Sequence, residues 1–282
     1  MKTILSFALI LTGFAAVAQL RTPAASPAGT VTAVVGLTEV KIEYSRPRVK
    51  GRKIFGDGAA FVTPYGAIWR TGANAGTKIT FADDVTVEGT KVAAGTYLIF
   101  SWPGATEWTI TFYSDLNLGG DTGHYDKSKE VANFKVKSEK LAEKIETLTF
   151  NIGDISDDSK TAKVQLTWEN TSVKFGVAVD FDKKVMESID RTVGNGGGSF
   201  YQAANYYFEN GKDNQKALDW ATIATTADKG AYWAWLLKAK IQKAMGDKKG
   251  AMESSVASRA AADKDGNKDY VKMNDDLQKS LK

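Results

Sequence analysis

The sequence contains no cysteine and a single histidine, His124. Without cysteine, the chain cannot form disulfides, hold zinc or an iron–sulfur cluster through thiolates, use a cysteine nucleophile, or carry a lipid on a thiol. With one histidine it cannot build a multi-histidine metal site, and a catalytic triad could use only His124. No Gly-x-Ser-x-Gly elbow, Walker loop or dinucleotide fingerprint is present. We therefore expect no metal, no cofactor and no catalytic residues.

An excess of charge of one sign is also missing. Residues 19–179 carry 19 basic and 18 acidic side chains, and residues 180–282 carry 17 and 15. Nucleic-acid binding needs a broad positive field, so nucleic acid is not an expected partner. Bulky apolar side chains are abundant, with seven Trp, ten Tyr and thirteen Phe. They supply enough surface for packed cores that need no disulfides.

Only the N-terminus carries a long apolar run. Met1-Lys2 is a short basic start, residues 4–18 are almost wholly apolar, and Ala16-Val17-Ala18 is a small-x-small cleavage pattern. This pattern predicts a signal peptide over residues 1–18. The run is shorter than the roughly 20 residues that a membrane-spanning helix needs. We therefore expect an exported protein, periplasmic or extracellular, with no membrane span after cleavage.

Apolar and polar residues alternate in the first half of the remaining chain. The clearest runs are Val40–Tyr44, Trp108–Phe112, Leu148–Ile152, Val164–Trp168 and Val173–Val179. Such alternation is typical of antiparallel strands with one buried face. Turn residues, such as Glu88-Gly89, separate the runs. The pattern predicts an antiparallel β-sandwich or jelly-roll-like domain over residues 29–179, after a linker over residues 19–28.

From residue 180 onward the period becomes helical. Residues Phe200, Ala203, Ala204, Tyr207 and Gly211 align with Trp235, Lys238, Ala239, Gln242 and Gly246 at an offset of 35. Ala217 and Ala251 lie 34 apart, and this spacing is that of tetratricopeptide repeats. The match is degenerate, and a generic helical bundle is the alternative. The whole chain is therefore predicted to be α+β by segregation, with a helical domain over residues 180–282 that could contact a protein partner.

Two segments of the β-domain concentrate polar chemistry. The first, Tyr44–Lys53, carries five cations in eight residues, and Pro47 favours an exposed loop. Arg46, Lys50 and Arg52 in this loop could grip a carboxylate or a phosphate. The alternative is that the arginines bond backbone carbonyls and brace the fold.

The second segment is Pro64–Asn74. Trp69, Arg70 and Asn74 in it could form a floor for a polar group. The alternative is that Trp69 belongs to the core and Arg70 reaches a buried carbonyl. A third loop, Gly119–Asp126, places His124 beside acids. Acid–base work is conceivable there, but a solvated loop is the favoured interpretation.

Four segments, the hallmark segments, together carry a family resemblance. They are Glu43–Gly56, Pro64–Asn74, the Phe81–Tyr97 stretch with its Ala-Gly-Thr-Tyr end, and Trp168-Glu169-Asn170. With them, residues 25–179 resemble the domain of unknown function 2911 family. The resemblance implies an all-β domain in the envelope of Gram-negative bacteria, and it brings no established activity. Arg46, Lys50, Arg52, Trp69, Arg70 and Asn74 all lie in these segments.

The sequence therefore favours an exported, non-enzymatic binding module. The six residues just named are the candidate ligand-binding set, for a polar or anionic small molecule, a glycan or a peptide. One alternative is an envelope hydrolase acting on glycan or peptide. The other is a purely structural domain in which the same residues brace loops.

Overall fold

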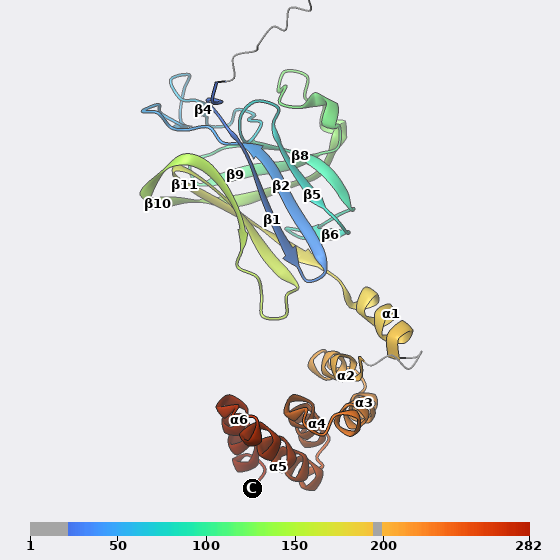
Figure 1. The fold of residues 1–282 in the computed structure, drawn as a ribbon. Coiled ribbons are helices and arrows are strands. Elements are labelled where there is room, and N and C mark those ends of the chain that lie inside the picture. The colour runs from blue at the N-terminus through green and yellow to red at the C-terminus, as the bar shows by residue number, and fades with distance from the viewer. Residues whose placement is uncertain (1–21, 194–198) are drawn as a thin grey trace, which may run out of the picture. The chain divides into compact units, whose positions relative to one another are not determined.

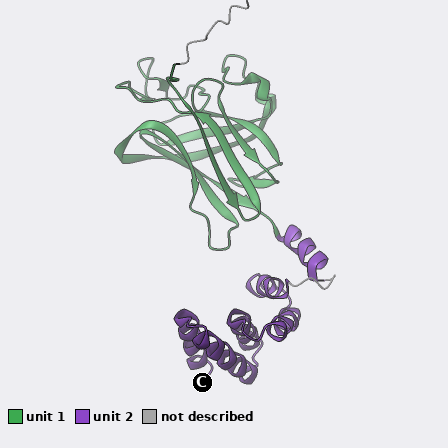
Figure 2. Ribbon diagram, in the orientation of Figure 1, with its two compact units in different colours: residues 1–181 green, residues 182–282 purple. Residues whose placement is uncertain are grey.

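The chain consists of a β-unit followed by a helical unit. A computed structural model describes residues 22–193 and 199–282, and the compact units span residues 1–181 and 182–282 (Figure 2). This arrangement confirms the predicted α+β class. The predicted signal peptide and the glycine-rich break at residues 194–198 lie outside the described residues. Among the helices that are described, none has the length and apolar character needed to cross a bilayer.

The β-unit is built on nine strands in the order β1-β2-β5-β8-β9-β10-β11-β6-β7 (Figure 1). All neighbours pair antiparallel, as the alternation predicts. The strands are β1 Ala28–Val35, β2 Thr38–Ser45, β5 Thr77–Phe81, β6 Val85–Val87, β7 Thr90–Val92, β8 Gly95–Trp102, β9 Glu107–Tyr113, β10 Glu130–Gly153 and β11 Thr161–Val179. A short parallel pair joins β3 Phe55–Gly56 to β4 Thr63–Pro64.

Strand β10 is much longer than its Leu148–Ile152 run predicts. Its first part, up to Lys137, pairs with β9, and the part from Ser138 onward pairs with β11. Lys140 faces Thr171 and Ile145 faces Glu169, so residues 141–144 lie opposite the single residue Asn170. Extra residues of this kind bend a strand. The bulge lies just after β10 has changed partners, which alternation alone does not indicate.

The sheet curls until β2 reaches β10, although three strands separate them in the sheet order. The Tyr44 ring on β2 lies 4.9 Å from the Phe150 ring on β10. The Phe150 backbone N–H donates to the Tyr44 hydroxyl at 3.1 Å. Beyond β2, the Leu148 N–H donates to the Pro47 carbonyl at 2.9 Å. The curled sheet thus encloses one aromatic core.

Four rings form the centre of that core. Phe55 lies near the end of the first hallmark segment, Trp69 follows β4, and Trp108 and Trp168 lie on β9 and β11. Trp69 stacks on Trp168 at 5.8 Å, and its ring centroid lies 6.0 Å from that of Trp108. Phe55 meets Trp108 edge-on at 4.9 Å. Ring pairs in these geometries contribute about 0.5–1.5 kcal/mol each beyond area burial.

The helical unit contains two helix pairs with matching turns. Its helices are α1 Asp182–Val193, α2 Phe200–Glu209, α3 Asn214–Ala227, α4 Tyr232–Ala244, α5 Lys248–Lys264 and α6 Lys268–Lys279. Gly211 and Gly246 follow α2 and α4 at φ 61° and 84°, a conformation that favours glycine. The carboxylates of Asp213 and Asp247 cap α3 and α5. The two turns therefore reproduce the periodicity of the sequence.

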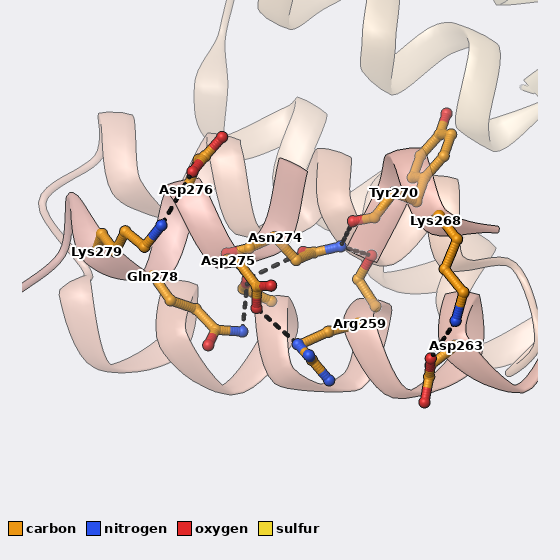
Figure 3. A network of polar contacts seen from close by, with 11 residues as sticks. Arg259, Asp263, Lys268, Tyr270, Asn274, Asp275, Asp276, Gln278 and Lys279 are labelled. Carbon is orange, nitrogen blue, oxygen red and sulfur yellow. Dashed lines mark hydrogen bonds and ion pairs between the residues drawn. The ribbon is translucent and has the colours of Figure 1, made fainter. Parts of the chain in front are cut away.

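Polar contacts join α5 to α6 (Figure 3), and the centre of this network is buried. Asn274 is fully buried, and its Nδ2 donates to Ser258 Oγ and to the Tyr270 carbonyl, both at 2.8 Å. Its Oδ1 accepts from Ser255 Oγ at 2.9 Å. A satisfied buried network of this kind fixes how two helices pack.

Replacing Tyr44 by Phe tests whether the curl depends on the seam with β10. The Phe150 N–H loses its buried acceptor, which costs about 1–3 kcal/mol. We expect a lower urea midpoint and faster hydrogen exchange at the Phe150 amide. Thr32→Ser, on the exposed side of β1, is the control. Unchanged exchange at Phe150 would contradict this role.

Replacing Asn274 by Ala tests the α5–α6 network. The hydroxyls of Ser255 and Ser258 each lose a buried partner, so we expect a loss of about 1–3 kcal/mol in the stability of the helical unit. Helical circular dichroism during urea unfolding measures it. Lys272→Ala, exposed on the same helix, should change stability by less than about 0.5 kcal/mol. Equal effects of the two substitutions would rule out a specific role for Asn274.

Candidate ligand pocket and the motif loops

Arg46 lies against β10 and does not point to an open pocket. Its Nε donates to the Leu148 carbonyl at 3.4 Å, and an Nη donates to Thr149 Oγ1 at 3.3 Å. Its aliphatic stem covers Gly29, where an added Cβ would come within 2.7 Å of it. Arg46 thus ties the end of β2 to β10.

Arg52 and Lys50 hold the basic loop in shape. The Arg52 guanidinium donates to the Val49 carbonyl at 3.2 Å and to the Arg48 carbonyl at 2.6 Å. Lys50 adopts a left-handed φ of 47°, and its backbone N–H donates to a Glu146 carboxylate oxygen at 2.8 Å. In the described part of the chain, the ammonium of Lys50 has no bonding partner.

The second motif folds back on itself. Trp69 is buried, and its indole N–H donates to the Gly72 carbonyl at 3.1 Å. An Arg70 Nη donates to the Asn74 carbonyl at 2.9 Å. The Asn74 amide donates to Ser45 Oγ at 3.0 Å, from a left-handed φ of 57°. Trp69 therefore belongs to the core, and the polar pair closes a loop.

The candidate residues thus bond within their own loops, as Arg52 and Arg70 do, or to segments packed against them, as Arg46 does with β10. The arginines and Asn74 bond carbonyls or hydroxyls of the fold, as the structural alternative predicts. Left-handed backbone is concentrated in the same segments. Seven non-glycine residues in the described chain have clearly positive φ, and five of them lie in the four hallmark segments: Lys50, Thr71, Asn74, Glu88 and Glu169.

A pocket of about 270 Å³ lies where three hallmark segments meet. Phe55 from the first, Tyr65 from the second and the Glu169-Asn170 pair from the last all line it. Trp108 lines it as well. The volume is below the roughly 300–1,000 Å³ of pockets for drug-sized ligands, so it suits a single small ring or residue.

The polar wall of the pocket comes from the β10 bulge and β11. Glu139 and Lys140 precede the bulge, Asn170 lies opposite it, and Glu169 pairs with Ile145 just after it. The Asn170 amide donates to the Leu141 carbonyl at 3.2 Å, which leaves its Oδ1 as an acceptor. Glu169 holds a left-handed φ of 52°. Strained backbone of this kind costs about 1–3 kcal/mol and clusters at functional sites.

Two indole N–H groups of the aromatic core have no hydrogen-bond partner. Within the described residues, Trp108 Nε1 and Trp168 Nε1 are buried without an acceptor. Trp108 is 0% exposed, and its Nε1 is closed off from the pocket that other atoms of the residue line. A buried donor without a partner costs about 1–3 kcal/mol, so each one calls for a physical reason.

The sequence did not single out this pocket. The signal available in the sequence was that Tyr65, Glu169 and Asn170 lie inside the motif segments, which could meet in the folded chain. Glu139 and Lys140 carry no such signal, because they lie on β10 and its change of partner was not predicted.

His124 lies on a solvent-exposed loop, as favoured from the sequence. Its Nδ1 lies 2.7 Å from an Asp121 carboxylate oxygen, and both side chains are more than half exposed. The hydrogen bond and the charge of Asp121 raise the pKa of His124, and the same bond lowers the pKa of Asp121. Across residues 22–193 and 199–282, no group of three or more His, Asp or Glu side chains could hold a metal ion.

The fold and the pocket define an antiparallel β-unit that carries a small polar pocket and is followed by paired helices. Residues 26–177 match the family model described as Protein of unknown function (DUF2911), and the chain belongs to this family. No curated protein and no solved structure matches the chain.

The His124–Asp121 pair predicts a titration that NMR can follow, because the chain has one imidazole. The pKa of His124 should lie above its ordinary 6.5, since the Asp121 carboxylate stabilises the imidazolium. The ion pair persists below this pKa and is lost as the pH rises through it. Asp121→Asn should return the pKa toward 6.5, and Asp126→Asn is the matched control. An identical titration in Asp121→Asn would disprove the pairing.

Proposed function

We propose that this protein is an exported, non-enzymatic binding module, and that the pocket lined by Phe55, Tyr65, Trp108, Glu169 and Asn170 is its ligand site. One observation carries the proposal. Residues that are far apart in sequence, and that belong to three of the four hallmark segments, line this one concave surface.

Two features of the pocket support a ligand role over pure packing. Asn170 uses its amide N–H to donate to the Leu141 carbonyl, and its Oδ1 can accept a hydrogen bond from a ligand. Glu169 keeps a strained φ of 52° beside it. A solely structural turn would tolerate glycine or asparagine there at lower cost.

The basic loop is a weaker site for an anion than its sequence suggests. The Arg46 and Arg52 guanidinium groups already donate to groups of the fold. We therefore propose the pocket, and not the cations of the basic loop, as the ligand site.

A hydrolase acting on glycan or peptide is the second candidate. The observation that favours it is the presence of two carboxylates, Glu139 and Glu169, in one pocket, since paired carboxylates perform glycoside hydrolysis.

For the helical unit we propose a surface for a protein partner. Its exposed apolar side chains support this idea: Ile223, Trp233, Met245, Val256 and Met273.

Thermal unfolding in the presence of small polar compounds tests the site. The panel is a neutral monosaccharide, a neutral dipeptide, inorganic phosphate and acetate. At 100 times its dissociation constant, a compound that binds the native state stabilises it by about 2.7 kcal/mol. We expect at least one compound to raise the melting temperature by several degrees, and Glu169→Gln to reduce this shift.

The matched control is Glu39→Gln, which removes the same charge from an exposed position outside the pocket. Two results would overturn the proposal. One is a panel without any shift. The other is a phosphate shift that Lys50→Ala abolishes and Glu169→Gln leaves intact, because the basic loop would then be the site. Release of product from a glycan or peptide would favour the hydrolase.

A further inference from the structure

The core side of strand β10 continues into the pocket. Its buried residues on that side, before the pocket, are Ala132, Phe134 and Val136. Side chains of a strand alternate between its two faces, so Ser138 and Lys140 share the face of these three residues, and both line the pocket. Glu139, between them, lies on the opposite face. The pocket wall therefore receives the ammonium of Lys140 but not the carboxylate of Glu139.

The acceptors of the pocket come from β11. Glu169 and Asn170 are neighbours on this strand, and both line the pocket. The Asn170 amide N–H donates to the Leu141 carbonyl, which leaves Oδ1 as an acceptor beside the Glu169 carboxylate. With Glu139 on the other face, Glu169 is the carboxylate that remains to act among the described residues of the pocket. This arrangement favours binding over hydrolysis by two carboxylates.

Lys140 and Glu169 carry opposite charges, yet they do not pair. Within the described residues, neither side chain has a hydrogen bond or an ion pair, with the other or with a third group. The register separates them, because Lys140 lies opposite Thr171 and Glu169 lies two residues away, opposite Ile145. A ligand between them would meet a cation on one strand and a carboxylate on the other.

A ligand of a single charge suits only part of this wall. An anion such as phosphate would be attracted by Lys140 and repelled by Glu169. A cation would be attracted by Glu169 and repelled by Lys140. An uncharged molecule would bind neither with a fully charged partner, although charge-assisted hydrogen bonds are roughly twice as strong as neutral ones. A molecule that carries both an ammonium and a carboxylate matches both charges at once.

The rest of the pocket is apolar and small. Phe55 is buried and Tyr65 is half-buried, and both contribute rings to the lining. Gly104 and Ala105 also line the pocket and add no bulk beyond a methyl group. A short apolar side chain can pack on these rings. The volume of about 270 Å³ limits such a ligand to the size of an amino acid or of the smallest dipeptides.

We infer that the pocket binds a small zwitterion of the amino acid class. Its ammonium lies on Glu169 and Asn170, and its carboxylate lies on Lys140. Its side chain packs on Phe55 and Tyr65. Free amino acids and dipeptides both carry these two charged groups, and the test distinguishes the two sources. This inference rests on the proposed function, since it names the ligand class of the same site.

Calorimetric titration of the full chain measures which charges of the ligand contribute. The probes are leucine, leucinamide without the carboxylate, N-acetylleucine without the ammonium, and glycylglycine. We expect leucine to bind about tenfold more tightly than either derivative, because each derivative loses one charge-assisted hydrogen bond. Binding of glycylglycine and not of leucine would support the inference with a peptide as the source.

Two variants assign each charge of the ligand to a residue. Lys140→Met should weaken leucine or glycylglycine binding about tenfold and leave leucinamide binding unchanged. Glu169→Gln should weaken leucine and leucinamide binding, and it should not weaken N-acetylleucine binding. The matched controls are Lys137→Met, exposed on the other face of β10, and Glu39→Gln, exposed on β2. Neither control should change any affinity.

Backbone amide spectra verify that each variant folds, and shifts at Asn170 and Thr171 during titration locate the ligand. If phosphate, a neutral monosaccharide or a singly charged derivative shifts these amides and neither zwitterion does, the ligand class is wrong while the pocket remains the binding site. If no probe shifts them, both this inference and the proposed function fail. Equal zwitterion affinity in the native chain, Lys140→Met and Glu169→Gln would also overturn the inference, because the zwitterion would then bind elsewhere.

Discussion

The stack of Trp69 on Trp168 is the contact on which the rest of the β-unit depends. It joins the second hallmark segment to β11, and Phe55 and Trp108 close around it from the first segment and from β9. Each of these rings is at least nine-tenths buried. Loops that are far apart in sequence are thus fixed to one centre, and the pocket lies against the same rings. The geometry of the pocket is therefore set by the core.

The polar residues of the motifs act around this centre. Arg46 and Arg52 bind carbonyl oxygens, and Asn74 takes a left-handed backbone that its short side chain tolerates. A motif rich in Arg and Asn reads as a binding site in a linear sequence. In the folded chain the same residues hold the loops in place. The polar groups that remain available to a ligand lie beside the β10 bulge and on β11.

Much of the fold could be predicted, because burial of one sheet face imposes a period of two. The runs at Val40–Tyr44, Trp108–Phe112 and Val164–Trp168 all lie in strands. The change to a helical period marks the second unit, where the Ala217 and Ala251 methyl groups are fully buried at equivalent positions of α3 and α5.

The length of β10 and its change of partner were not predictable, because alternation does not identify the neighbour of a strand. Glu139 and Lys140 were missed for that reason. Trp108 was identified as a strand residue, but its unpartnered N–H depends on packing that no local pattern encodes.

The central claim is that the motif segments converge to make a ligand site, and a crystal structure grown with the compound that raises the melting temperature most tests it most directly. The account predicts this compound against Tyr65, with polar atoms about 3 Å from the side chains of Glu169 and Asn170. An empty pocket at a saturating concentration, or a compound bound only at the basic loop around Lys50, would contradict it.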